Sequence, residues 1–166
     1  MNAIFKRCSV RQFTDEPVSI DDIERLMRAA MAAPSAGNQQ PWEFYIARDE
    51  TTRLALAAAS PYAAPAKLAP CVIVACARTE GLRFPPCSPL DMSAAVENIL
   101  LEAANIGLGA VWLGIAPESD RMAAVEVALG SPKGVEPFAL VAVGHAANHP
   151  EPKGPTRYDE TRVHWI

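Results

Sequence analysis

Three polar residues near the start of the chain could together bind a phosphate group. Arg7, Ser9 and Arg11 occupy alternate positions in the stretch RCSVRQF. In an extended segment the three side chains share one side, and in a helix the two arginines lie four residues apart on one face. Two guanidinium groups and a hydroxyl are suitable donors for a phosphate dianion. The alternative is a pair of solvated arginines, which is the usual state of this residue.

A second polar group follows in the stretch APSAGNQQPW, residues 33–42. Pro34 stops the preceding helix, and Gly37 permits a turn with positive φ. Four polar side chains then stand just before a strand, namely Ser35, Asn38, Gln39 and Gln40. A carboxamide is both donor and acceptor, so it can pair with a heterocycle that displays N–H and C=O side by side, such as the pyrimidine edge of a flavin. The alternative is an ordinary polar turn.

Length and composition indicate one globular domain over residues 1–166. Half of the residues are hydrophobic and 20% are charged, which excludes a disordered chain. A net charge of −4 with scattered basic residues argues against nucleic acid as a partner. The apolar runs are far shorter than the roughly 20 residues that span a bilayer. Because the first residues lack the features of a secretory signal, we expect no membrane partner and a cytoplasmic protein.

Several common site types lack their signatures in this sequence. The four cysteines have no CxxC spacing and no nearby histidine pair, so we expect no metal site, and Cys71 and Cys76 are expected to be reduced, buried thiols. His145, His149 and His164 likewise have no metal-binding spacing. Motifs of Rossmann folds, P-loops and serine hydrolases are absent, and no catalytic acid or base is assigned.

Hydrophobic periodicity predicts alternating helices and strands, which indicates a mixed α and β class. A capping box at Ser19 predicts a helix that ends before Pro34. The other helices are expected over 2–7, 50–59, 91–107 and 119–129, and the strands over 42–48, 70–77, 108–115 and 136–145. Residues 78–89 are expected to form an irregular loop.

Two segments carry residues of unexpected polarity. The helix over 91–107 is apolar almost all round except for one stripe, formed by Asn98, Glu102 and Asn105. The tail over 148–166 ends in an aromatic and aliphatic cluster, RYDETRVHWI, which would gain nothing from exposure to water. We expect this tail to pack on a partner subunit or on its own domain.

Four stretches in this order resemble the nitroreductase family of FMN-dependent oxidoreductases, from about residue 4 to the end of the chain. They are RCSVRQF, APSAGNQQPWEF, DMSAAVENILLEAANIGLGAVWLG and RYDETRVHW. The resemblance implies an α+β fold with a central mixed β-sheet flanked by helices. It also implies a homodimer with two FMN sites at the interface and a C-terminal tail that is exchanged between the subunits.

The resemblance also implies which residues bind FMN. Those matching the phosphate and ribityl positions are Arg7, Ser9 and Arg11. Those matching the segment that reaches the isoalloxazine of the other subunit are Pro34, Ser35, Ala36 and Asn38, and Gln40 matches the same region. The backbone of Leu113 and Gly114 matches a segment that lines the flavin. Arg162 matches a basic position near the phosphate, with Arg157 as a second candidate, and Cys8 replaces an arginine of many members.

The activity implied by the resemblance is that of an FMN-dependent NAD(P)H oxidoreductase. Hydride would pass from NADH or NADPH through FMN to a small electrophilic acceptor, such as a nitroaromatic or a quinone, by a two-step exchange. Relatives with the same fold fragment reduced flavin or remove halogen from aromatic rings, which leaves those reactions as alternatives. A flavin-binding carrier or sensor without turnover is a further alternative. Longer members of the family often build part of the active-site cover from the loop that corresponds to residues 78–89. This loop is short and rich in proline here, so the resemblance does not extend to the substrate range.

Overall fold

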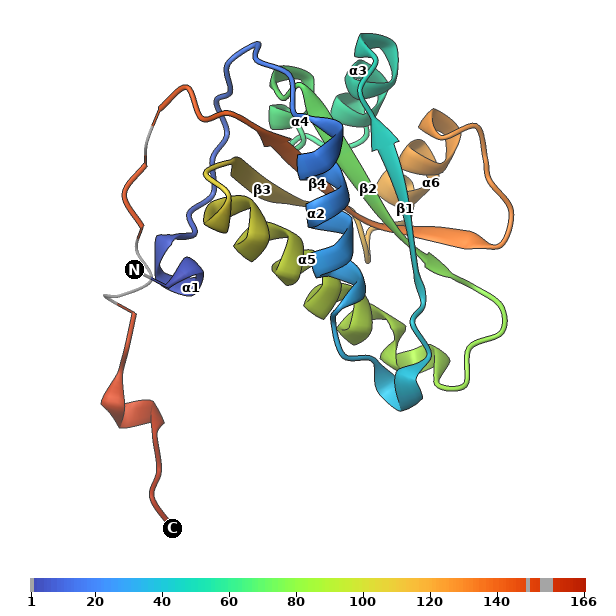
Figure 1. Ribbon diagram of the computed structural model, residues 1–166. Coiled ribbons are helices and arrows are strands. Elements are labelled where there is room, and N and C mark those ends of the chain that lie inside the picture. Colours follow the sequence, from blue (N-terminus) through green and yellow to red (C-terminus); the bar gives the residue numbers. More distant parts are fainter. Residues whose placement is uncertain (1, 149, 153–156) are drawn as a thin grey trace.

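Four strands form a sheet in the order β1-β2-β4-β3 in the computed structural model, which describes residues 2–148, 150–152 and 157–166 (Figure 1). The strands are β1 (Trp42–Ala47), β2 (Cys71–Arg78), β3 (Gly109–Gly114) and β4 (Val135–Gly144). All four predicted strands are therefore present, with ends shifted by one residue.

The prediction of a mixed sheet was wrong, because each of the three neighbouring strand pairs is antiparallel. Helix α5 (Ser88–Asn105) connects β2 to β3, and these two strands run in the same direction. They are not neighbours, however, because β4 lies between them and runs the opposite way. The alternation of helices and strands along the sequence does not reveal this insertion.

Helices cover both faces of the sheet (Figure 1). Besides α5 they are α1 (Ala3–Lys6), α2 (Ile20–Met31), α3 (Glu50–Ala58), α4 (Pro65–Leu68) and α6 (Ser119–Ala128). Short 3₁₀ turns span Ala36–Asn38, Pro85–Cys87 and Glu160–Arg162. The sequence did not predict α4. It also placed the start of α5 at residue 91, whereas the helix begins at Ser88, since a proline is tolerated in the first helical turn.

Strand β2 is buried on both faces, as its unbroken apolar run predicts. Ile73 and Ala75 face a core shared with α2 and α5, whereas Val72 and Val74 face a core shared with α3, α4 and α6. The two strand cysteines are free and buried on opposite sides. Burial raises the pKa of Cys71 to about 11 and that of Cys76 to about 12, so both thiols stay protonated at neutral pH.

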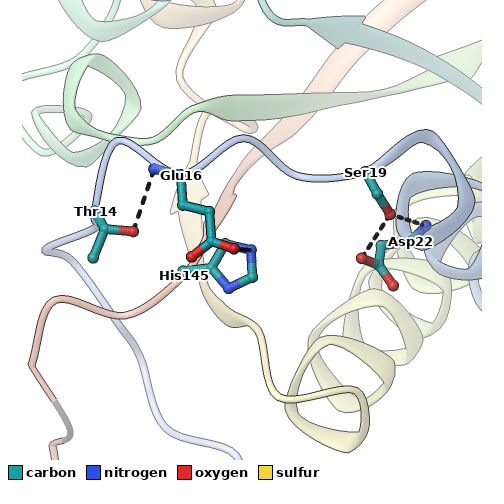
Figure 2. Close-up of polar contacts among 5 residues, drawn as sticks. All are labelled: Thr14, Glu16, Ser19, Asp22 and His145. Atoms are coloured by element: carbon teal, nitrogen blue, oxygen red, sulfur yellow. Dashed lines mark hydrogen bonds and ion pairs between the residues drawn. The ribbon is translucent and has the colours of Figure 1, made fainter.

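The start of α2 is set by its predicted cap. The hydroxyl of Ser19 accepts from the amide of Asp22 at 3.0 Å and donates to its carboxylate at 2.7 Å (Figure 2). The segment before this cap is tied to the end of β4. There Nε2 of His145 lies 3.6 Å from the carboxylate of Glu16 (Figure 2), and the amide of Thr14 donates to the carbonyl of His145. These contacts fix the path of the chain between α1 and α2.

The polar stripe of α5 faces α2. Nδ2 of Asn98 donates to the carbonyl of Ala29 at 2.9 Å, and the carboxylate of Glu102 lies 2.8 Å from the guanidinium of Arg25. Asn105 donates to the same carboxylate at 3.1 Å. Asn98 and Glu102 of the stripe therefore join α5 to α2. Within the part of the chain that the structure describes, no helix has both the length and the apolar character that crossing a bilayer requires.

Candidate functional site

The segment 7–11 lies extended against the edge strand β3. Ser9 forms an isolated parallel bridge with Ala110, and the amide of Val10 donates to the carbonyl of Ala110 at 3.0 Å. Val10 is buried, and a Cβ at Gly109 would lie only 2.7 Å from its side chain. The missing side chain at Gly109 therefore lets the segment approach the strand closely.

This geometry decides between the two conformations that the sequence allows for the segment. Helix α1 ends at Lys6, and Arg7 already has extended backbone, with φ −57° and ψ 126°. Because side chains alternate along extended backbone, burial of Val10 directs Ser9 and Arg11 to the opposite side. The structure thus brings the three predicted phosphate-binding residues together.

A cavity of about 380 Å³ opens beside the segment. It is lined by Arg7, Cys8, Ser9, Arg11, Pro150, Glu151 and Arg157. Three guanidinium groups against one carboxylate make the cavity electropositive. A phosphate ester fits such a donor set, since guanidinium groups form short charge-assisted hydrogen bonds to its oxygens.

Arg7 already has an acidic neighbour on α5. Its Nε lies 3.5 Å from Oε1 of Glu97, and the two side chains are 24% and 47% exposed. A phosphate that reaches Arg7 must therefore compete with the Glu97 carboxylate. Arg11 donates to the carbonyl of Ser9 at 3.3 Å and is exposed, so its remaining donors point toward solvent beside the cavity.

The two tail arginines lie in different surroundings. Arg157 lines the cavity with Arg7 and Arg11. Arg162 is 84% exposed and pairs with Asp159 at 3.1 Å, and it does not line that cavity. Within one chain the structure therefore brings the second candidate, Arg157, and not Arg162, to the cavity that Arg7 and Arg11 line.

The segment 34–40 forms a second polar surface. Oγ of Ser35 accepts from the amide of Gln40 at 3.0 Å, and Nε2 of Gln40 donates to Oδ1 of Asn38 at 3.1 Å. Asn38 and Gln40 are exposed, as are the neighbouring Pro34 and Gly37. Exposed carboxamides at a tight turn are available to pair with a heterocycle at the surface.

Gln39 differs from its polar neighbours in direction. Its side chain turns inward, where Nε2 donates to the carboxylate of Asp91 at 2.7 Å and Oε1 accepts from the amide of Phe84 at 2.8 Å. Asp91 is 5% exposed and comes from the first turns of α5. Sequence reasoning missed Asp91, for which a single acidic residue opening an apolar helix was the available signal.

Replacing Gly37 by alanine should destabilise the turn. Gly37 has φ +55°, and an added Cβ would lie 2.5 Å from Cε2 of Phe84, whereas Gly81 has φ +71° with nothing within 4 Å. Left-handed backbone costs an alanine roughly 1–2 kcal/mol in either variant. In urea unfolding followed by circular dichroism, Gly37→Ala should therefore lose more than Gly81→Ala by about 1 kcal/mol or more. Equal losses would show that the turn accepts a side chain.

The third predicted group lies at the end of β3. Leu113 is buried in the core on the α3 and α6 side, so its backbone is the part left for a ligand. Gly114 is exposed, with nothing within 4 Å of the position its Cβ would take, and its carbonyl accepts from Arg121 at 3.4 Å. An open glycine at a strand end permits close approach of a flat ligand.

The first two groups are attached to different positions of α5. Each is attached to α5: Arg7 through Glu97, and Ala36 through Asp91, whose Oδ1 accepts from the Ala36 amide at 2.9 Å. Positions 91 and 97 are about 9 Å apart along the helix and about 120° apart around it. Figure 1 shows the Ala36–Asn38 turn beside the first turn of α5, with α1 farther along this helix.

The end of the tail is exposed over 157–166 and extends away from the sheet (Figure 1). Tyr158 is 77% exposed and Trp165 is 94% exposed. Residues 149 and 153–156 of the predicted tail lie outside the described residues. Arg157 lines the cavity at 7–11, whereas the alternative of docking on its own domain does not hold for residues 158–166. Aromatic groups exposed to this degree are characteristic of a surface that a partner covers.

In the described ranges, no group of three or more His, Cys, Asp or Glu side chains could hold a metal ion. His149 lies outside those ranges. His145 is engaged with Glu16. The polar chemistry of the described site thus comes from arginine, hydroxyl and carboxamide groups.

Comparison with known proteins gives a consistent result. The model of the Nitroreductase family matches residues 4–145. A candidate NADH dehydrogenase/NAD(P)H nitroreductase of Archaeoglobus fulgidus is 36% identical, over 99% of this chain and 95% of that protein. The crystal structure of a candidate NADH oxidase of Clostridium acetobutylicum has 40% identity and a TM-score of 0.94, over 98% of each chain. A candidate nitroreductase of Desulfovibrio desulfuricans, solved in complex with FMN, has 32% identity and a TM-score of 0.78, over 89% of this chain and 86% of that one.

Proposed function

Because the chain belongs to the nitroreductase family, we propose that it is an FMN-dependent oxidoreductase that uses NADH or NADPH to reduce small electrophilic acceptors, such as nitroaromatics or quinones, by a two-step exchange. The observation that carries this proposal is the electropositive cavity beside the segment 7–11. The FMN complex of the Desulfovibrio relative supports flavin mononucleotide as the ligand.

The residues present fit FMN in two parts. The guanidinium groups of Arg7, Arg11 and Arg157 would hold the phosphate, with the hydroxyl of Ser9 near the ribityl chain. The exposed carboxamides of the segment 34–40 would orient the isoalloxazine through its N–H and C=O groups. When bound, the flavin supplies the electron-transfer chemistry, and the protein's part is to hold it, orient it and limit access.

A homodimer would complete this site. The cavity at 7–11 and the surface at 34–40 lie at different positions around α5, so one chain presents the two groups separately. We therefore propose that the segment 34–40 of one subunit meets the flavin held by the 7–11 segment of the other. The exposed apolar side chains at the end of the tail support its exchange between subunits.

Access to the flavin would be governed by the backbone at the end of β3. Gly114 has no side chain to cover a flat ring, and its carbonyl is already engaged by Arg121. Neither the backbone of Gly114 nor the guanidinium of Arg121 is assigned a proton-transfer role. No side chain of the described site is assigned as a catalytic acid or base. A nicotinamide donor and an acceptor would occupy the same open space in turn.

The purified protein should be yellow, and its flavin absorbance should bleach within seconds when NADH or NADPH is added without oxygen. Addition of a quinone or a nitroaromatic should restore the band, because the acceptor reoxidises the flavin. A yellow protein that neither nicotinamide bleaches would favour a carrier or sensor. A colourless protein that FMN does not reconstitute would contradict the assignment of the cofactor.

A further inference from the structure

We propose that Asp91 is a positioning residue that holds the segment 34–40 in the shape required to meet the flavin. This inference rests on the proposed function for the role of the segment, but the contacts that carry it stand within one chain. The carboxylate of Asp91 accepts from the amide of Ala36 at 2.9 Å and from Nε2 of Gln39 at 2.7 Å. It thus bonds both the beginning and the end of the turn.

The turn needs such support because its backbone is unfavourable. Three of its residues have left-handed backbone, with φ +55° at Gly37, +56° at Asn38 and +48° at Gln40. Two of the three carry a Cβ, for which this region is disfavoured. Backbone of this kind persists where the surroundings over-determine it, and such sites cluster where ligands bind.

Contacts from two further parts of the chain hold the same turn. Gln39 exchanges two hydrogen bonds with the backbone of Phe84, at 2.8 Å and 3.1 Å. Nη2 of Arg78, at the end of β2, donates to the carbonyls of Gln39 and Gln40 at 3.0 Å and 2.9 Å. The strand end, the 78–89 loop and α5 therefore all converge on the turn.

The hydrogen bonds have a fixed polarity that makes the role of Asp91 testable. Both oxygens of Asp91 accept, so the amide nitrogen of Gln39 must face Asp91 and its oxygen must face the amide of Phe84. Because Asp91 is 5% exposed, water cannot readily replace a lost partner. Asp91→Asn would place an amide nitrogen against the amide nitrogen of Gln39, and it would loosen the turn without changing the volume of the side chain.

The first experiment measures the turn itself in flavin-free protein. Hydrogen exchange of the peptide that contains residues 34–40 should be about tenfold faster in Asp91→Asn than in the unmodified protein, since one buried hydrogen bond is lost. Asp120→Asn makes the same chemical change at an exposed residue in the first turn of α6, and it should leave this exchange unchanged. Equal exchange in all three proteins would overturn the proposal that Asp91 holds the turn.

The second experiment measures the consequence for the cofactor. In fluorescence titrations, Asp91→Asn should raise the dissociation constant of FMN about five- to tenfold. It should also change the visible circular dichroism of the bound flavin, which reports how the ring is held and which a loss of global stability would not alter. The double variant Asp91→Asn, Gln39→Glu restores a donor and an acceptor between the two positions but loses the bond from Nε2 of Gln39 to the carbonyl of Phe84, so it should recover part of the affinity and of the flavin spectrum.

The outcomes separate this inference from the proposed function. Unchanged FMN affinity and an unchanged flavin spectrum in a folded Asp91→Asn would overturn the positioning role while FMN binding stands. A protein that takes up no FMN would refute the proposed function, whereas the exchange measurement would still decide whether Asp91 holds the turn. If Asp91→Asn does not fold, Gln39→Met removes the side-chain partner of Asp91 together with both hydrogen bonds to Phe84, and unchanged exchange of residues 34–40 in this variant would overturn the inference.

Discussion

Deleting residues 157–166 should convert the protein into a monomer that does not retain FMN. The deleted segment contains exposed apolar side chains, among them Trp165 and Val163. Burial of these side chains against a second subunit would lower the free energy of the dimer. The deleted segment also contains Arg157, which lines the electropositive cavity. With the dimer lost, the segment 34–40 of the partner would no longer reach the flavin, and FMN affinity should fall by about a hundredfold or more.

Light scattering and the flavin band of the purified protein check this result. Trp165→Ala tests the tail in its folded form, and it should weaken the dimer by about tenfold or more, because buried tryptophans dominate interface energies. Tyr62→Ala is the matched control, since Tyr62 is also an exposed aromatic residue, at 72%, but precedes α4. A yellow dimer after deletion of the tail would contradict the exchange of tails between subunits.

Replacing Arg7 by alanine should weaken FMN binding by about ten- to a hundredfold, because a hydrogen bond to a charged group contributes roughly 1.5–3 kcal/mol. The variant removes one of the guanidinium groups of the cavity and leaves the carboxylate of Glu97 without its partner near the phosphate. Both changes act in the same direction. Titration of flavin-free protein with FMN measures the effect.

Two further variants test the sign of this electrostatic argument. Glu97→Gln removes the carboxylate that lies 3.5 Å from Arg7, so it should tighten FMN binding by a few-fold. Arg28→Ala is the matched control for Arg7→Ala, since Arg28 is 80% exposed and pairs with Glu24 on the same helix, and it should leave FMN binding unchanged. Unchanged affinity in Arg7→Ala would remove Arg7 from the site, and weaker binding in Glu97→Gln would contradict the competition between carboxylate and phosphate.

Local patterns in the sequence were sufficient to predict the elements that position the site. The Ser19 cap and the apolar spacing after it predict α2, and the unbroken run of β2 predicts a strand that is buried on both faces. The predicted and observed ends differ at the start of α5. There the prolines before residue 91 indicate a loop, whereas one of them is tolerated in the first helical turn. The short helix α4 was missed because four residues are too few to show a period and it has no side-chain cap, whereas α1, of the same length, is capped by Asn2.

Within the site, residue types and spacing predicted which segments carry polar chemistry but not every direction in which side chains point. Arg7, Ser9 and Arg11 do converge, since extended backbone aligns alternate residues. Gln39 could not be distinguished by sequence from Asn38 and Gln40, although it faces Asp91, which lies 52 residues later. The same holds for Arg157 and Arg162, whose surroundings depend on where the tail lies.

The sequence by itself determined the mixed α and β class, the positions of the strands and most helices, and the two polar segments, because these follow from periodicity, caps and residue chemistry over short distances. Only the tertiary structure decided that β4 lies between β2 and β3 and that Asp91, Phe84 and Arg78 hold the 34–40 turn. It also decided that the two polar segments contact α5 at different positions. Those features depend on contacts between residues far apart in the chain, and such contacts leave no local period or motif from which they could be predicted.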